Sequence, residues 1–228
     1  MAEPIRIISS MATRQLLADL VAEFNKTSTQ AVQVESVGGV DAARRVQAGE
    51  AFDAVALASD AIDRLADAGH LVGGRVDLVR SGVAVAVRAG APRPDIGSGE
   101  AVRRAVLAAP TLGYSTGPSG VQLQRQFERW GIADAIQGRI VQAPPGVPVG
   151  QLVADGRVAL GFQQFSELMN LPGIDVLGPL PADIQITTTF SAAVAASCTR
   201  PDSVRALLAF MAAPAMDAVK RRNGMEPG

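Results

Sequence analysis

Apolar residues recur along the chain with two different periods, which predict a series of strands and helices. In residues 13–25 they follow the i, i+3, i+4 spacing of a helix with one buried face. Short apolar runs typical of strands lie on either side of this stretch. Over the first 70 residues we expect strands at 5–9, 32–36 and 54–57 and helices at 13–25, 41–48 and 60–68. This β-α-β-α-β-α order favours a parallel sheet with helices on both faces.

The pattern changes at residues 81–87, an expected strand with no helix directly behind it. A second α/β series follows, with strands expected at 111–114, 139–141 and 159–162 and helices at 100–108, 120–130 and 149–154. A β-prone run at 187–196 and two helices that begin near proline, 201–211 and 214–222, end the chain. Two α/β series in one short chain predict an α/β fold of two lobes, and we expect the end of the chain to return to the first lobe. The expected lobes are 1–81 plus 191–228, and 82–190.

Three expected strands end in small hydroxyl or glycine residues just before a helix. Free backbone N–H groups and hydroxyls at a helix N-terminus suit a small anion, because the first-turn donors are unpaired and the helix dipole is positive there. The ligand candidates at these junctions are Ser9, Ser10 and Met11, then Gly38 and Gly39, and then Ser115, Ser119 and Gly120. Ser59, which follows the third strand, is a further candidate. The chemistry predicted here is anion binding.

Simpler explanations stand beside these hypotheses. Thr13 is a natural N-cap for the first helix. The pair Gly38 and Gly39 either lets a ligand approach the backbone closely or supplies a turn with positive φ. Gln163 and Gln164 are adjacent on a strand and should therefore point to opposite faces, so that one of them reaches the ligand while the other packs.

The amino-acid composition excludes several classes of binding partner and site. The formal net charge is -1, whereas a nucleic-acid binder carries a clustered surplus of basic residues. Aromatic residues make up only 4% of the chain, which leaves little for a base-stacking platform. The single cysteine, Cys198, excludes an internal disulfide and a multi-cysteine metal site, and we expect an inert buried thiol there. We expect no metal, no cofactor and no nucleic-acid partner.

The N-terminal sequence bears on location. No basic region with a long apolar segment precedes the first strand, so the chain as written is expected in the cytoplasm. A processed mature form would look the same and would belong in the periplasm. A transporter partner is expected only if the protein is exported. No apolar stretch approaches the roughly 20 residues that cross a bilayer, so we expect no membrane insertion.

Five segments carry a resemblance: residues 7–24, the stretch Ala43-Arg44-Arg45-Val46-Gln47-Ala48-Gly49-Glu50-Ala51-Phe52-Asp53-Ala54-Val55, Gly117-Pro118-Ser119-Gly120, Trp130-Gly131-Ile132 and Ala159-Leu160-Gly161-Phe162. Together they resemble the type 2 periplasmic-binding-protein fold and, within it, the molybdate-binding proteins of ABC transporters. The resemblance covers nearly the whole chain, and it implies two Rossmann-like lobes joined by two crossover strands, with a ligand cleft between them.

The resemblance implies an oxyanion held by a hydroxyl in each of the first two strand-to-helix loops and by a tyrosine late in the second lobe. Alignment on the helices places Ala12, the region of Gly39 and Val40, and Gln164 at those positions. Most side-chain ligands for molybdate are therefore absent, although Ser10 could substitute for one. Backbone donors near Met11, Gly39 and Ser119 would remain.

The aconitate isomerases are also similar to this branch, so two functions stay open. The first is binding of a small oxyanion or carboxylate. The second is isomerisation of an unsaturated carboxylic acid by a proton shift, which needs a base and donors for the developing negative charge. Glu35, Asp60 and Glu167 are the candidate bases. A cytoplasmic sensor that signals ligand state to another protein is a third class.

Overall fold

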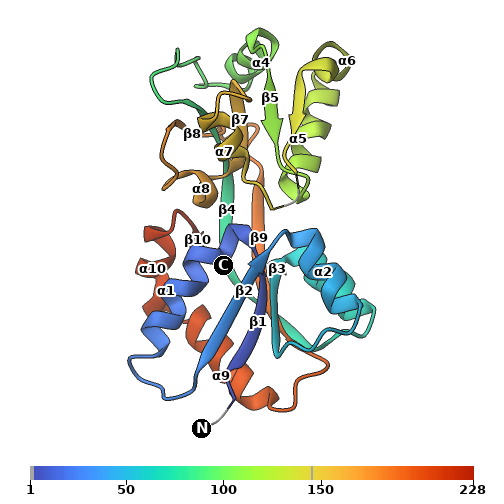
Figure 1. The fold of residues 1–228 in the computed structure, drawn as a ribbon, viewed down its shortest axis with the longest axis vertical. Helices are drawn as coiled ribbons and strands as arrows, with labels where there is room; N and C mark the ends of the chain where they lie inside the picture. Colours follow the sequence, from blue (N-terminus) through green and yellow to red (C-terminus); the bar gives the residue numbers. More distant parts are fainter. Residues whose placement is uncertain (1–2, 145) are drawn as a thin grey trace. The chain divides into compact units, whose positions relative to one another are not determined.

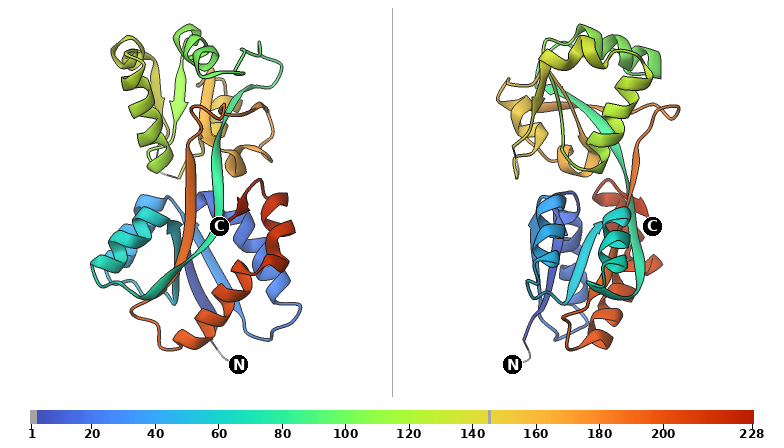
Figure 2. Two further views of the ribbon diagram at one scale, coloured as in Figure 1. Left: turned by 180° about the vertical axis from the view of Figure 1, so that it is seen from behind. Right: turned by 90° about the vertical axis from the view of Figure 1, so that its right-hand side faces the viewer.

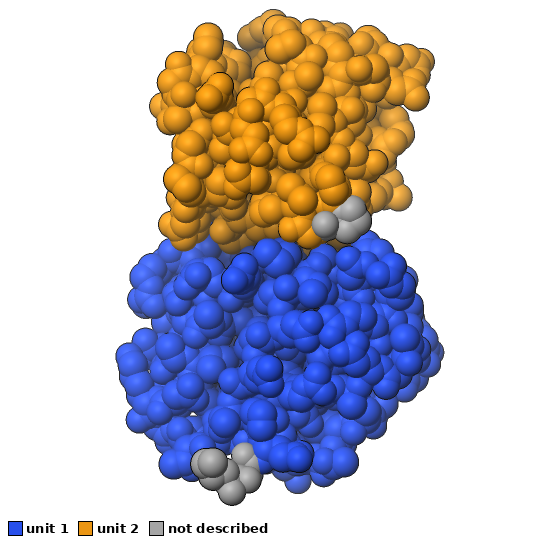
Figure 3. All heavy atoms as spheres, in the orientation of Figure 1, with its two compact units in different colours: residues 1–80, 189–228 blue, residues 81–188 orange. Residues whose placement is uncertain are grey.

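The chain divides into two compact units in the computed structural model, which describes residues 3–144 and 146–228 (Figures 1 and 3). Unit 1 comprises Met1–Arg80 and Thr189–Gly228, and unit 2 comprises Ser81–Thr188. Two strands, β4 (Leu71–Arg88) and β9 (Thr187–Ala195), run from one unit into the other. Unit 1 is therefore discontinuous in sequence.

The sheet of unit 1 has the strand order β2-β1-β3-β9. Strands β1 (Ile5–Ser10), β2 (Val32–Val37) and β3 (Ala54–Ala58) are parallel, as expected. Strand β9 is antiparallel to β3, because the chain returns into this sheet directly and without a crossover helix. The first part of β4 pairs with β10 (Glu226–Pro227), also antiparallel. The three strands of the β-α-β-α-β-α series are thus parallel to one another, and the antiparallel pairs of β9 and β10 make the sheet as a whole mixed.

Helices cover both faces of this sheet (Figures 1 and 2). One face packs on α1 (Arg14–Phe24), α9 (Pro201–Ala212) and α10 (Asp217–Arg222). The other face packs on α2 (Gly39–Gln47) and α3 (Ser59–Asp67). Alternate side chains of β1 separate accordingly, with Ile5 and Ile7 in the first core and Ile8 in the second. The two short 3-10 helices of unit 1 are η1 (Met11–Thr13) and η3 (Pro214–Met216).

The sheet of unit 2 contains three parallel strands, β5 (Leu112–Tyr114), β6 (Ile140–Gln142) and β7 (Leu160–Gln164). The second part of β4 is antiparallel to β7 and to β8 (Ile174–Pro179). The helices of unit 2 are α4 (Gly99–Ala108), α5 (Pro118–Arg129), α6 (Ala133–Ile136), η2 (Gln137–Arg139), α7 (Val149–Ala154) and α8 (Phe165–Leu168).

The two faces of this second sheet have different kinds of packing. The face toward α4 and α5 is rich in large side chains, and Phe127 of α5 makes edge-to-face ring contacts with Tyr114 and Phe162. The face toward α7 carries glycines. A Cβ added at Gly161 would lie 2.5 Å from the side chain of Val153, so α7 lies this close because the strand has no side chain there. Residues on one face of the strands thus pack on α5 and those on the other on α7.

Several elements were not expected from the sequence. Helices α6 and α8 have four residues each, and β8 contains glycine and proline. Strand β4 begins at Leu71 rather than residue 81, and it passes through Gly73, whose positive φ of 74° only glycine adopts readily. Over the described residues, no helix is both long and apolar enough to span a membrane.

Candidate functional site

Three helix N-termini lie at one edge of the unit 1 sheet. Register pairs Ser9 with Ser36 and with Ala56, so β1, β2 and β3 end together at what we call the carboxyl edge of unit 1. η1, α2 and α3 begin there, and none of the three starts is capped by a side chain. Their first-turn N–H groups therefore point out of this edge with the positive ends of the helix dipoles.

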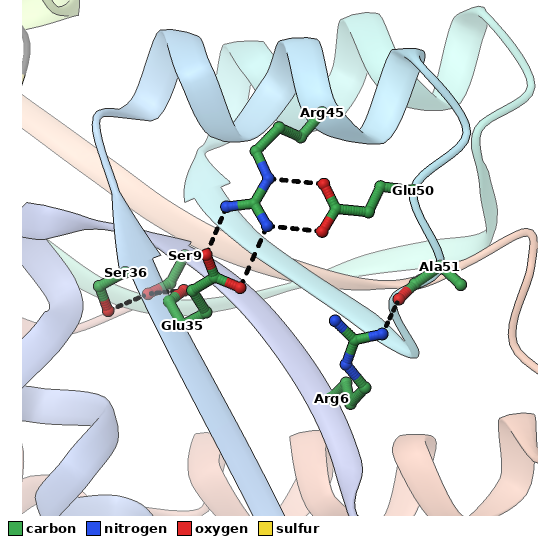
Figure 4. A network of polar contacts seen from close by, with 7 residues as sticks. All are labelled: Arg6, Ser9, Glu35, Ser36, Arg45, Glu50 and Ala51. Atoms are coloured by element: carbon green, nitrogen blue, oxygen red, sulfur yellow. Dashed lines mark hydrogen bonds and ion pairs between the residues drawn. The ribbon is translucent and has the colours of Figure 1, made fainter.

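Two of the predicted serine ligands at this edge have different surroundings. Ser9 is fully buried, and its Oγ lies 2.7 Å from the Oγ of Ser36, which ties β1 to β2 (Figure 4). Ser10 is also buried, but its Oγ lies 3.5 Å from the Oγ1 of Thr13, at the limit of a hydrogen bond. Thr13 makes no capping hydrogen bond with its side chain and donates instead to the carbonyl oxygen of Ser10. Thr13 stands at the N-cap position of α1, as expected, but without a side-chain cap, and Ser10 has the longer hydrogen bond of the two serines.

The remaining unit 1 candidates stand at the helix starts. Gly38 is the N-cap of α2 and Gly39 its first residue, and neither has a positive φ. The explanation of this pair as a left-handed turn is therefore wrong. Met11 opens η1 and Ser59 opens α3, both half-buried.

A matching edge exists in unit 2. Register aligns Tyr114 with Gln142 and with Phe162, so β5, β6 and β7 end at the carboxyl edge of unit 2. Helix α5 follows β5 through a short loop, and the hydroxyl of Ser115 in this loop lies 3.3 Å from that of Ser119 in the first turn of α5. The N-cap, Gly117, provides no side-chain cap.

Only glycine fits at position 120, because the backbone of this loop leaves no room for a side chain. A Cβ at this position would lie 1.7 Å from the carbonyl oxygen of Ser115, which no side chain tolerates. The loop thus folds tightly onto the first turn of α5, and this contact holds Ser115 beside Ser119. Gly120 serves the shape of the site rather than supplying a side-chain ligand.

The two glutamines at the end of β7 point to opposite faces, as predicted. Gln163 accepts a hydrogen bond from the backbone N–H of Gly150 in α7 and donates to Glu167. Gln164 lies on the α5 face with Phe162, and its Nε2 donates to the Oγ1 of Thr188 at 2.9 Å. The Oε1 of Gln164 is buried and has no hydrogen-bond partner among the described residues. Gln164 is therefore the glutamine with an unused polar atom on the α5 face.

The three candidate bases have different partners in the structure. Glu35 forms an ion pair with Arg45, at 2.5 Å, and this hydrogen-bonded partner lowers the pKa of the carboxyl group (Figure 4). The same guanidinium also holds Glu50. Asp60 pairs with Arg64 at 3.0 Å, and both side chains are exposed. Each of these two carboxylates is therefore paired with an arginine.

Glu167 differs from both. It lies in α8, directly after β7, and is half-buried. Burial raises the pKa of its carboxyl group to about 7, against a lowering effect from the hydrogen bond donated by Gln163 at 2.8 Å. No cation pairs with it among the described residues. A carboxyl group with such a pKa can both accept and donate a proton near neutral pH.

The remaining polar side chains are weaker candidates for a binding or catalytic role. Cys198 is half-buried rather than buried, and the pKa of its thiol is raised, chiefly by burial. Within residues 3–144 and 146–228, no group of three or more His, Cys, Asp or Glu side chains could hold a metal ion. The sequence analysis did not single out two polar residues: Thr188, which accepts the hydrogen bond from Gln164, and Ser81. Ser81 is buried with an Oγ that has no described partner, and no sequence signal distinguishes either residue from others in a β-prone run.

Comparison with known proteins shows the family of the chain. A family model described as "Bacterial extracellular solute-binding protein" matches residues 5–226. An aconitate isomerase from a Pseudomonas species is 36% identical over 185 residues, which cover 80% of this chain and 70% of the isomerase.

Solved structures show the same fold at low identity. The periplasmic molybdate-binding protein of Azotobacter vinelandii has a TM-score of 0.80 at 18% identity, covering 97% of this chain and 98% of that one. The sulfate-binding protein of Mycobacterium tuberculosis has a TM-score of 0.81 at 15% identity, covering 99% and 87%. The chain therefore has the type 2 periplasmic-binding-protein fold and belongs to the family of bacterial extracellular solute-binding proteins.

Proposed function

We propose that this protein binds a small carboxylate anion through the N-terminus of helix α5 at the carboxyl edge of unit 2. The observation that carries the proposal is the start of α5, where the hydroxyls of Ser115 and Ser119 flank the uncapped first turn of a 12-residue helix. Hydroxyl and backbone donors at such a start favour an anion.

A carboxylate is favoured over a tetrahedral oxyanion for two reasons. The hydroxyl and tyrosine ligands that the molybdate binders would lead us to expect are replaced by Ala12, the Gly39 region and Gln164. In addition, the curated relative at 36% identity is an isomerase of aconitate, a tricarboxylate.

Thermal unfolding with a panel of anions tests this proposal. We expect cis- or trans-aconitate, or citrate, to raise the Tm by roughly 5–10 °C at about a hundredfold excess over Kd. Molybdate, tungstate and sulfate should have smaller effects. A flat response to the whole panel, or stabilisation by the oxyanions alone, would contradict the proposal.

Ser119→Ala tests the site at α5. Loss of one hydrogen bond to a charged ligand should weaken carboxylate binding about tenfold or more. The matched control is Ser203→Ala, the same chemical change at an exposed position of α9, which should bind as the unaltered protein does. Equal affinities of the two variants would exclude Ser119 from the site.

Isomerisation of aconitate is a second candidate function. The specific observation in its favour is the identity to the Pseudomonas isomerase over 80% of the chain. Incubation with cis- or trans-aconitate in D2O, followed by proton NMR, should show conversion of one isomer to the other. Binding without conversion would leave the first proposal in place and remove this one.

A further inference from the structure

Tyr114 is the only tyrosine of the chain, and its ring belongs to the core of unit 2. It is the last residue of β5, directly before the loop that leads to α5, and only 7% of the residue is exposed. The ring makes an edge-to-face contact with Phe127 of α5, with centroids 6.0 Å apart. A phenylalanine would pack in the same way, so the packing does not account for the hydroxyl group.

The hydroxyl group of Tyr114 is open to solvent and has no hydrogen-bond partner among the described residues. Within residues 3–144 and 146–228, the fully buried side-chain atoms without a partner are the Oγ of Ser81 and the Oε1 of Gln164. The Oη of Tyr114 is not one of these atoms, so solvent reaches it although the ring is buried. Because a buried tyrosine usually places its hydroxyl against a partner, this unpaired group points to a partner that comes from outside the chain.

The ring of Tyr114 lies against the first turn of α5. A Cβ added at Gly120, the third residue of the helix, would lie 3.3 Å from the Cδ2 of this ring. Pro118 has no N–H group, and the N–H of Val121 is bonded to a carbonyl oxygen of the loop at 3.2 Å. The free N–H groups of this turn are therefore those of Ser119 and Gly120. Tyr114 thus touches a residue that supplies one of the donors for the proposed anion.

The hydroxyl of Tyr114 is a neutral donor. Burial raises the pKa of this group above its ordinary value, so it keeps its proton at neutral pH. Residues 105–124 contain no charged side chain. An anion at this helix start therefore finds no cation along this stretch and depends on hydrogen-bond donors, to which the unpaired phenol adds one.

We infer that the hydroxyl group of Tyr114 donates a hydrogen bond to the anion bound at the start of α5. This inference rests on the proposed binding of a carboxylate and adds a ligand-binding residue to that site. The ring is in contact with both Phe127 and Gly120, so the hydroxyl is in position before the ligand arrives and little side-chain entropy is lost on binding. A donor on a rigid ring favours ligands whose oxygen atoms meet it, so Tyr114 contributes to specificity as well as to affinity.

NMR of the whole protein labelled with 13C at the Cζ of tyrosine tests the inference. The chain has one tyrosine, so one Cζ signal is expected. Addition of trans-aconitate should shift this signal. The pKa of Tyr114, measured by pH titration of the same signal, should rise further in the presence of the ligand, because an anion beside the hydroxyl disfavours the phenolate.

Tyr114→Phe removes the hydroxyl and keeps the ring. Its Tm without ligand should match that of the unaltered protein, whereas its affinity for trans-aconitate should be about tenfold weaker or more, because a hydrogen bond to a charged group is lost. Ser203→Ala, which removes an exposed hydroxyl from α9, is the control and should bind as the unaltered protein does.

The failures of the two proposals are distinguishable. Binding of trans-aconitate without a shift of the Cζ signal, or with equal affinity in Tyr114→Phe, shows that the hydroxyl is only hydrated; it overturns the role of Tyr114 and leaves carboxylate binding intact. Absence of binding by every carboxylate in the panel overturns both. The NMR measurement uses the unaltered protein, so it decides the question even if Tyr114→Phe folds poorly.

Discussion

Glu167 makes the protein sensitive to pH even without ligand. The folded state raises the pKa of this carboxyl group from 4.5 to about 7, so the folded chain holds a proton that the unfolded chain releases. Its contribution to stability is therefore complete below about pH 4.5 and is lost as the pH rises through about 7. The other carboxyl groups with a resolved shift, such as Glu35 and Asp53, have lowered pKa values and act in the opposite direction at lower pH.

Glu167→Gln should remove this dependence. Between pH 5 and pH 8, we expect the free energy of unfolding of the unaltered protein to fall relative to that of the variant by on the order of 2 kcal/mol. Urea denaturation of both proteins at the two pH values measures the difference. Parallel changes in the two proteins would show that Glu167 titrates normally.

At the scale of elements, the start of α5 depends on close contact between loop and helix. Three features meet there: a proline in the first turn, two serine hydroxyls, and Gly120 against the carbonyl oxygen of Ser115. Because a 12-residue helix begins at this loop, displacement of the loop would also move the N–H groups of its first turn.

Gly120→Ala should accordingly be costly. An added methyl group 1.7 Å from a backbone oxygen forces the loop away from the helix, and we expect a loss of at least about 2 kcal/mol of stability. Ligand binding at α5 should weaken as well. The control is Gly138→Ala, where an added Cβ meets nothing within 4 Å, and which should change stability little. Both can be measured by thermal unfolding with and without trans-aconitate.

The elements of unit 1 could be predicted because their periodicity is strong. Leu16, Leu17 and Leu20 mark one buried face of α1, and the run before them can only be a buried strand. The short elements of unit 2 could not, because four residues are too few to show a period. The sequence also offered three carboxylates as bases without a means to choose. The choice depends on Arg45, Arg64 and Gln163, and these partners are revealed only by tertiary structure.

At the scale of the whole molecule, unit 1 is built from segments far apart in the sequence. Leu207 and Leu208 of α9 pack in the same core as Ile5 and Ile7 of β1. The N-terminal strands therefore share one core with the C-terminal helices.

Leu207→Ala tests this shared core. Truncation of a fully buried leucine should cost about 2–5 kcal/mol. Hydrogen exchange should quicken in β1 and β3, more than 100 residues away in the sequence, as well as in α9 itself. Faster exchange confined to residues 201–212 would show that α9 is only loosely attached to the rest of unit 1.

The discontinuity of unit 1 also has a consequence for synthesis on the ribosome. Residues 1–80 emerge first, but β9 and α9, which complete their sheet and core, emerge only after all of unit 2. Unit 2 is contiguous and can fold as it is made. Until β9 arrives, β3 has an open hydrogen-bonding edge that another nascent chain could occupy. Faster synthesis of residues 81–188 shortens that exposure, so the yield of folded protein should depend on the translation rate of the middle of the message.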